Sequence, residues 1–110
     1  MTQTTIGKYI ITEEEFIPTA ASLLPRYNII VTKYDGTEIE KHTGCVGSRA
    51  RDYWRECSMM KISRLNWLWE SLEMAKHNIN CYDRPGYEEQ HKEEVDRAFM
   101  LTDWIGELEG

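Results

Sequence analysis

Apolar residues in the second half of the chain recur at steps of three and four, and this spacing constrains the fold more than any other feature. The stripe consists of Ile62, Leu65, Leu68, Trp69, Leu72 and Ala75. Such a period places these residues on one side of an α-helix, so another element of the fold has to cover them. Continued backward, the stripe includes Trp54, Cys57 and Ser58. We therefore expect Trp54 to be buried.

Two helix lengths are compatible with this stripe. The segment forms either one helix over residues 48–77 or two helices that are broken near Ser63. We favour the break, because Ser63 is a residue type that caps helices and because ~30 residues is long for a helix in a domain of this size.

A second helical pattern runs from about Tyr87 to Leu108. It follows a loop over residues 78–86 that contains Pro85 and Gly86, which favour a new helix start. The apolar seam of this helix consists of Val95, Ala98, Leu101, Ile105 and Leu108, widened by Phe99 and Trp104.

The first 42 residues have the two-residue period of β-strands. Ile6–Ile11 is short, apolar and rich in strand-forming residues. The runs Tyr27–Lys33 and Thr37–His42 flank Asp35 and Gly36, which suit the positive φ values of a tight hairpin turn. The second run alternates between two faces, so we expect one face of this β-hairpin to meet water.

The segment between these strands carries signals of a helix. Thr12 and Glu15 have the spacing of a capping box, which indicates a helix start. Pro18 limits that helix, because proline in a helix interior removes a backbone donor. We expect a short helix over residues 18–24 that ends at Pro25.

Together these elements predict a single α+β domain over residues 1–110. A small antiparallel sheet, made from the N-terminal strand and the β-hairpin, is expected to pack against two or three C-terminal α-helices. Of the 110 residues, 41% are hydrophobic, which is enough for one modest core. No apolar run approaches the ~18 residues that cross a bilayer, and residues 1–5 lack the features of a secretory signal. Three irregularly spaced cysteines argue against a disulfide framework, so we expect a reduced, cytoplasmic protein.

Metal and catalytic chemistry have little support in the residue pattern. The soft ligands are Cys45, Cys57, Cys81, His42, His77 and His91. They lack the paired spacings of structural zinc sites, and Cys57 lies on the apolar stripe, where a free cysteine acts as a small hydrophobe. Cys45 near His42 is a candidate nucleophile, but no local signature frames it. We expect no metal, no cofactor and no catalytic residue.

The net charge of −6 hides a basic segment over residues 41–64, which carries six basic and two acidic groups. A glycine before a helix N-terminus, followed by arginines in the first turns, suits a phosphate or another anion. The candidate anion- or partner-binding site consists of Gly47, Ser48, Arg49, Arg51 and Arg55. Arg51 and Arg55 share a helix face, and we expect both to be exposed. In the alternative interpretation, Ser48 caps the helix and the arginines pair with acidic groups of the protein itself.

A second set of residues favours a protein interface. Met60, Trp67 and Met74 are seven residues apart, on a side of the helix offset from the apolar stripe, and Tyr53 lies among the arginines. Trp, Tyr, Met and Arg are enriched at protein interfaces. We take these four residues as the candidate protein interface, with a twofold homodimer as one expected use.

The sequence thus favours a small non-enzymatic binding protein that occludes or sequesters a partner. Inhibitors and accessory factors of phages or mobile elements fit this description. The first alternative is a module that binds an anion, a nucleotide or a nucleic-acid backbone through the Gly-Ser-Arg segment. Nucleic acid is disfavoured by the net negative charge, and no membrane partner is expected. The second alternative is a small nucleotide-handling enzyme.

Overall fold

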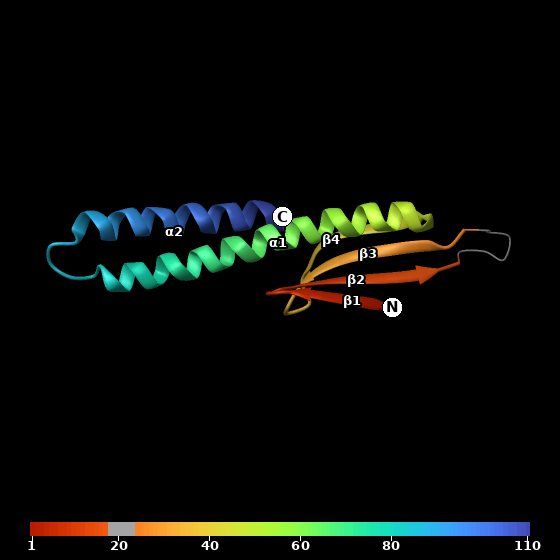
Figure 1. Ribbon diagram of the computed structural model, residues 1–110, viewed down its shortest axis with the longest axis horizontal. Coiled ribbons are helices and arrows are strands. Elements are labelled where there is room, and N and C mark those ends of the chain that lie inside the picture. Colours follow the sequence, from red (N-terminus) through yellow and green to blue (C-terminus); the bar gives the residue numbers. More distant parts are fainter. Residues whose placement is uncertain (18–23) are drawn as a thin grey trace. The chain divides into compact units, whose positions relative to one another are not determined.

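A computed structural model describes residues 1–17 and 24–110 of the chain. In this part of the chain, four β-strands precede two α-helices, which confirms the α+β class (Figure 1). The elements are β1 (Thr2–Ile6), β2 (Tyr9–Phe16), β3 (Arg26–Lys33), β4 (Glu38–Val46), α1 (Gly47–Cys81) and α2 (Glu88–Glu109). The chain divides into two compact units, Met1–Ser63 and Arg64–Gly110, here called unit 1 and unit 2.

The described strands of unit 1 form one antiparallel sheet in the order β1-β2-β3-β4, so each strand pairs with the next along the chain. The expected hairpin is confirmed as β3 and β4. Its turn has Gly36 at φ 92°, and the Thr37 N–H donates to Asp35 Oδ1 at 3.0 Å. That hydrogen bond stabilises the carboxylate and lowers the pKa of Asp35.

The N-terminal segment differs from the expectation. A strand was expected over Ile6–Ile11, but Gly7 (φ 58°) lies in a turn that joins β1 to β2. The helix start at Thr12 is also wrong, because Thr12 to Phe16 continue β2. The capping box is a local signal, and pairing of β2 with β3 along eight residues overrides it. The helix expected over residues 18–24 falls mainly on residues 18–23, which lie outside the described residues.

The core of unit 1 lies between the sheet and the first half of α1 (Figure 1). Its buried residues are Tyr9, Ile11, Tyr27, Ile29, Val31 and Cys45 on the sheet, with Ser58 and Ile62 on α1. Polar contacts border this core, since Lys61 Nζ lies 3.7 Å from Glu40 Oε1 and Trp54 stacks on His42 with ring centroids 4.1 Å apart. Trp54 is half-buried rather than fully buried as expected.

Helix α1 is continuous over 35 residues, so the expected break near Ser63 is wrong. The apolar stripe explains this, because Ile62 and Leu65 on either side of Ser63 are both fully buried. The helical period keeps its phase through this point. A break would turn one part of the stripe toward water, and capping by Ser63 does not compensate for that loss.

Unit 2 is a helical hairpin formed by the rest of α1 and by α2, joined by residues 82–87. Its buried residues are Leu65, Leu68, Leu72 and Ala75 on α1 and Leu101 and Ile105 on α2. Along each helix these buried residues are three or four positions apart, as in other pairs of packed helices. Phe99 and Trp104, expected to widen the α2 seam, are exposed instead.

Replacing Ile11, which is 1% exposed on β2, tests the core of unit 1. We expect Ile11→Ala to reduce the free energy of unfolding by roughly 2–5 kcal/mol, because it leaves a cavity among the sheet residues. The matched control is Ile17→Ala, since Ile17 is 67% exposed and should lose no more than about 0.5 kcal/mol. Urea denaturation measures both; equal losses would contradict the assignment of the inner face.

A substitution at Ser63 tests whether this segment forms one helix or two. In the interior of a continuous helix, Ser63→Ala should stabilise the protein by up to about 0.5 kcal/mol, because alanine is the better helix former. If Ser63 capped a second helix, the same change would cost about 1 kcal/mol. Ser71→Ala, on the same helix, is the control and should follow the first pattern. Thermal denaturation shows whether each substitution stabilises or destabilises the protein.

Candidate functional site

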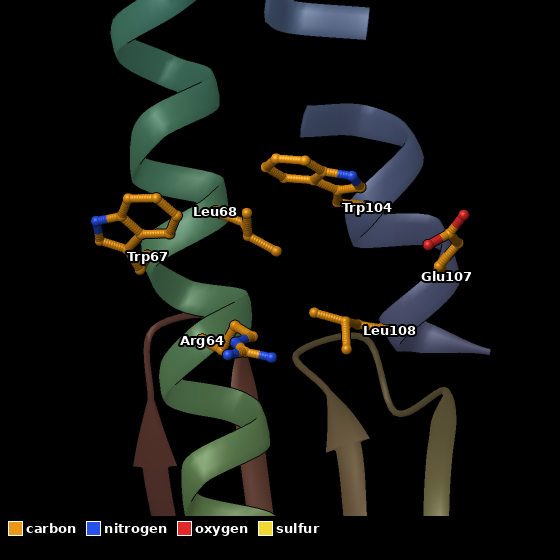
Figure 2. A pocket seen from close by; sticks show the side chains of 6 residues that line it. All are labelled: Arg64, Trp67, Leu68, Trp104, Glu107 and Leu108. Carbon is orange, nitrogen blue, oxygen red and sulfur yellow. The ribbon is translucent and has the colours of Figure 1, made fainter. Parts of the chain in front are cut away.

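A groove of about 590 Å³ opens in unit 2 where α1 and α2 lie side by side (Figure 2). Its lining residues are Arg64, Trp67 and Leu68 on α1 and Trp104, Glu107 and Leu108 on α2. In both helices the lining residues are separated by single steps and by steps of three, which brings them to one side of the helix. The groove is therefore defined by two short helical segments of the hairpin.

The floor of the groove is apolar, and its tryptophans are open to water. Figure 2 shows Leu68, Trp104 and Leu108 reaching into the space between the helices, whereas Trp67 lies on the far side of α1. Leu68 is buried, but Trp67 is 59% exposed and Trp104 is 44% exposed. A tryptophan is costly to leave in water, so the pair provides a strong driving force for covering this groove.

Two opposite charges border the groove. Arg64 projects from α1 and Glu107 from α2, on opposite sides of the apolar floor (Figure 2). Both residues are exposed, and neither has an ion-pair partner among the residues that the structure describes. Their charged groups are therefore available to a molecule that covers the floor.

A second hollow, of about 370 Å³, lies along α2 and is called here the acidic hollow. Its lining residues are Glu93, Glu94, Asp96, Arg97 and Met100. The positions 93, 97, 100, 104 and 107 follow steps of four and three, so the acidic hollow and the groove share one side of α2. Glu94 Oε2 is buried and has no hydrogen-bond partner in the described part of the chain.

The structure brings one member of the expected protein interface to the groove. Trp67 lines it, while Met74 is exposed elsewhere in unit 2. Met60 and Tyr53 are exposed in unit 1. Sequence reasoning missed Trp104, which was assigned to the seam of α2. The signal was its position one residue before the seam residue Ile105, which turns Trp104 away from the seam.

The candidate anion site belongs to unit 1, where α1 begins. The Gly47 N–H donates to the Pro25 carbonyl at 3.1 Å, and Gly47 has φ 80°. This bond satisfies one of the amides that an anion would use. Ser48 and Arg49 are exposed, and Arg49 has no ion pair among the described residues.

Arg51 and Arg55 are half-buried and paired, so the expectation that both are exposed is wrong. Arg51 Nε donates to Asp52 Oδ1 at 3.0 Å, and this hydrogen bond raises the pKa of Arg51. Arg55 donates to the same oxygen at 3.1 Å and lies 3.5 Å from Glu13 Oε1. These pairs match the alternative interpretation of the arginines. Binding of an anion by this segment stays a prediction.

Cys45 and His42, the candidate nucleophile and its neighbour, are not arranged as a nucleophile with its base. Cys45 is buried, and its Sγ lies 4.0 Å from the His42 carbonyl oxygen rather than from the imidazole ring. The His42 ring stacks on Trp54, with Nε2 3.4 Å from Glu40 Oε2. In α1, Cys81 Sγ lies 3.5 Å from a nitrogen of His77.

The described residues contain no cluster of three or more histidine, cysteine, aspartate or glutamate side chains that could hold a metal ion. Within the same residues, no helix combines the length and apolar character needed to cross a membrane. Comparisons with protein-family models, with curated proteins and with solved structures find no match for this chain.

Charge reversal tests the role of the paired arginines. Arg51→Glu with Arg55→Glu places new carboxylates beside Asp52 and Glu13, so we expect a larger loss in the free energy of unfolding than in the control variant. The control, Lys41→Glu with Arg49→Glu, reverses two exposed charges of the same segment and should cost about 1 kcal/mol or less. Denaturation at low salt measures both; equal losses would mean that the ion pairs contribute nothing.

Proposed function

We propose that the protein is a non-enzymatic binding protein. A partner protein docks on the groove of unit 2 and is thereby occluded. The observation that carries this proposal is the pair of exposed tryptophans, Trp67 and Trp104, beside a buried apolar floor. Tryptophan is the residue type most enriched among the few residues that dominate binding energy in protein interfaces.

The form of the groove favours a protein over a small molecule. Small-molecule sites enclose most of the surface of their ligand and orient it with a few enclosed polar groups. Here the two tryptophans are themselves about half exposed, and the polar groups at the border, Arg64 and Glu107, are open to water. A small ligand would be covered on one side only. A partner protein brings its own cover and excludes water from the tryptophans.

Other exposed apolar residues of unit 2 lie outside the groove. Phe99 and Met74 are more than half exposed and line none of the hollows described above. Single exposed apolar residues are ordinary on protein surfaces. The proposal therefore rests on the grouping of Trp67, Trp104, Leu68 and Leu108 and not on the number of exposed apolar residues.

Capture of a partner by variants of the groove tests the proposal. We expect Trp67→Ala and Trp104→Ala each to weaken binding of a captured partner at least 30-fold, which corresponds to about 2 kcal/mol for a residue that dominates an interface. Phe99→Ala is the control, because Phe99 is 68% exposed on the same helix and lies outside the groove. Circular dichroism confirms that the variants fold. Partner binding that survives both tryptophan changes would place the docking site elsewhere.

The twofold homodimer expected from the sequence stays a separate prediction. Light scattering across a wide concentration range should then give about twice the chain mass of 13.0 kDa. A constant mass of 13.0 kDa would contradict it.

A further inference from the structure

We infer that the partner presents a basic amphipathic helix to unit 2, with an apolar side chain in the groove and a lysine or arginine in the acidic hollow. This inference rests on the proposed function, since it names the chemistry of the partner that the groove accepts. Three observations carry it: the charge of α2, the alignment of the two hollows and the unpartnered carboxylate of Glu94.

The net negative charge of the protein is concentrated on α2. This helix carries eight acidic and two basic residues, a net charge of −6, which equals the net charge of the whole chain. The rest of the chain therefore has no net charge. A charged surface of one sign raises the local concentration and the association rate of partners of the opposite sign. A partner that approaches the groove along α2 is thus selected for positive charge.

The alignment of the hollows matches an extended, rod-like partner. Arg97 in the acidic hollow and Trp104 in the groove are seven residues apart on one side of α2, or roughly 10 Å along the axis. A helix that lies along α2 presents side chains two turns apart at the same interval. Its apolar residue would contact Trp104 while a cationic residue about seven positions away reaches the acidic hollow. Amphipathic helices bind apolar grooves in this way.

Glu94 adds a need for a cationic donor. Its Oε2 is buried and has no hydrogen-bond partner in the described part of the chain. A buried acceptor without a partner is destabilising, and a charged donor satisfies it better than a neutral one. An ammonium or guanidinium group placed in the acidic hollow would supply that hydrogen bond once the Glu94 side chain turns Oε2 toward it, with Glu93 and Asp96 beside it.

Other occupants fit less well. A second copy of the chain would bring another α2 with a net charge of −6 toward the first, so like charges would oppose the contact. Nucleic acid is excluded from this surface by the same repulsion. A neutral apolar segment would cover the tryptophans but leave Glu94 without a donor.

Peptides that differ only in charge test the inference. The probe is a helical peptide of roughly 18 residues, built from leucine, lysine and alanine on an amphipathic pattern and free of tryptophan. One comparison peptide replaces every lysine with glutamate, and another keeps the composition but scrambles the order. Binding to the full chain is read from the fluorescence of its tryptophans and by calorimetry. We expect the cationic amphipathic peptide to bind at least 30-fold more tightly than either comparison peptide.

Variants of the chain test which carboxylates of α2 contribute to binding of the cationic peptide. Glu93→Gln with Asp96→Asn should weaken the cationic peptide about 10-fold, because both exposed carboxylates line the acidic hollow. The control, Glu89→Gln with Asp103→Asn, removes the same charge from exposed positions of α2 outside the groove and the acidic hollow, and should change binding less than about 2-fold. Trp104→Ala should abolish binding.

Several results would overturn the inference. Equal binding of the cationic and anionic peptides would mean that charge does not select the occupant, while the groove would remain a docking site. Equal effects of the two charge-neutralised variants would mean non-specific attraction. A mass near twice 13.0 kDa that Trp104→Ala returns to 13.0 kDa would identify a second copy as the occupant. If no peptide binds but capture of a partner still requires Trp67 and Trp104, the inference fails and the proposed function stands.

Discussion

Burial of one uninterrupted apolar stripe on α1 is the constraint on which the rest of the structure depends. Ser58 and Ile62 are buried in unit 1, and Leu65, Leu68, Leu72 and Ala75 are buried in unit 2. Because the period of the stripe never changes phase, α1 stays helical from Gly47 to Cys81. The sheet and α2 each need an apolar partner, and both find it on this one helix.

Part of the basic segment around the start of α1 pairs with acidic side chains of the sheet. The inner face of the sheet contains acidic side chains, Glu13 on β2 and Glu40 on β4. Arg55 and Lys61 on α1 lie 3.5 Å and 3.7 Å from these carboxylates. Carboxylates that are partly withdrawn from water require counter-charges, and the helix above them supplies these. Arg55 and Lys61, two of the six basic residues of this segment, therefore have a structural role.

The acidic residues of α2 outnumber its basic residues by six. Unit 1 carries eight basic and eight acidic residues and so has no net charge, whereas α2 has a net charge of −6 beside an apolar groove. Uncompensated charge contributes to long-range attraction in a way that paired charge does not. Unit 2 therefore has both a net charge and exposed tryptophans. This combination makes the groove a better candidate for a binding site than the arginine segment.

By itself, the sequence determined the elements whose signals are local and agree with their surroundings. The hairpin of β3 and β4 follows from the turn at Asp35 and Gly36, and the α1 stripe and the α2 seam at Leu101 and Ile105 follow from helical periodicity. The periodicity also placed Trp67 on a side of the helix that is offset from the stripe, and Trp67 is exposed.

Only the tertiary structure decided where a local signal yields to packing. The capping box at Thr12 became part of β2 because strand pairing gives its backbone more hydrogen bonds than a short helix would. Ser63 lies within a helix because Ile62 and Leu65 are both buried. Trp104 and Trp67 border the same groove because two consecutive helices lie side by side there, and no periodicity within a single helix encodes that encounter.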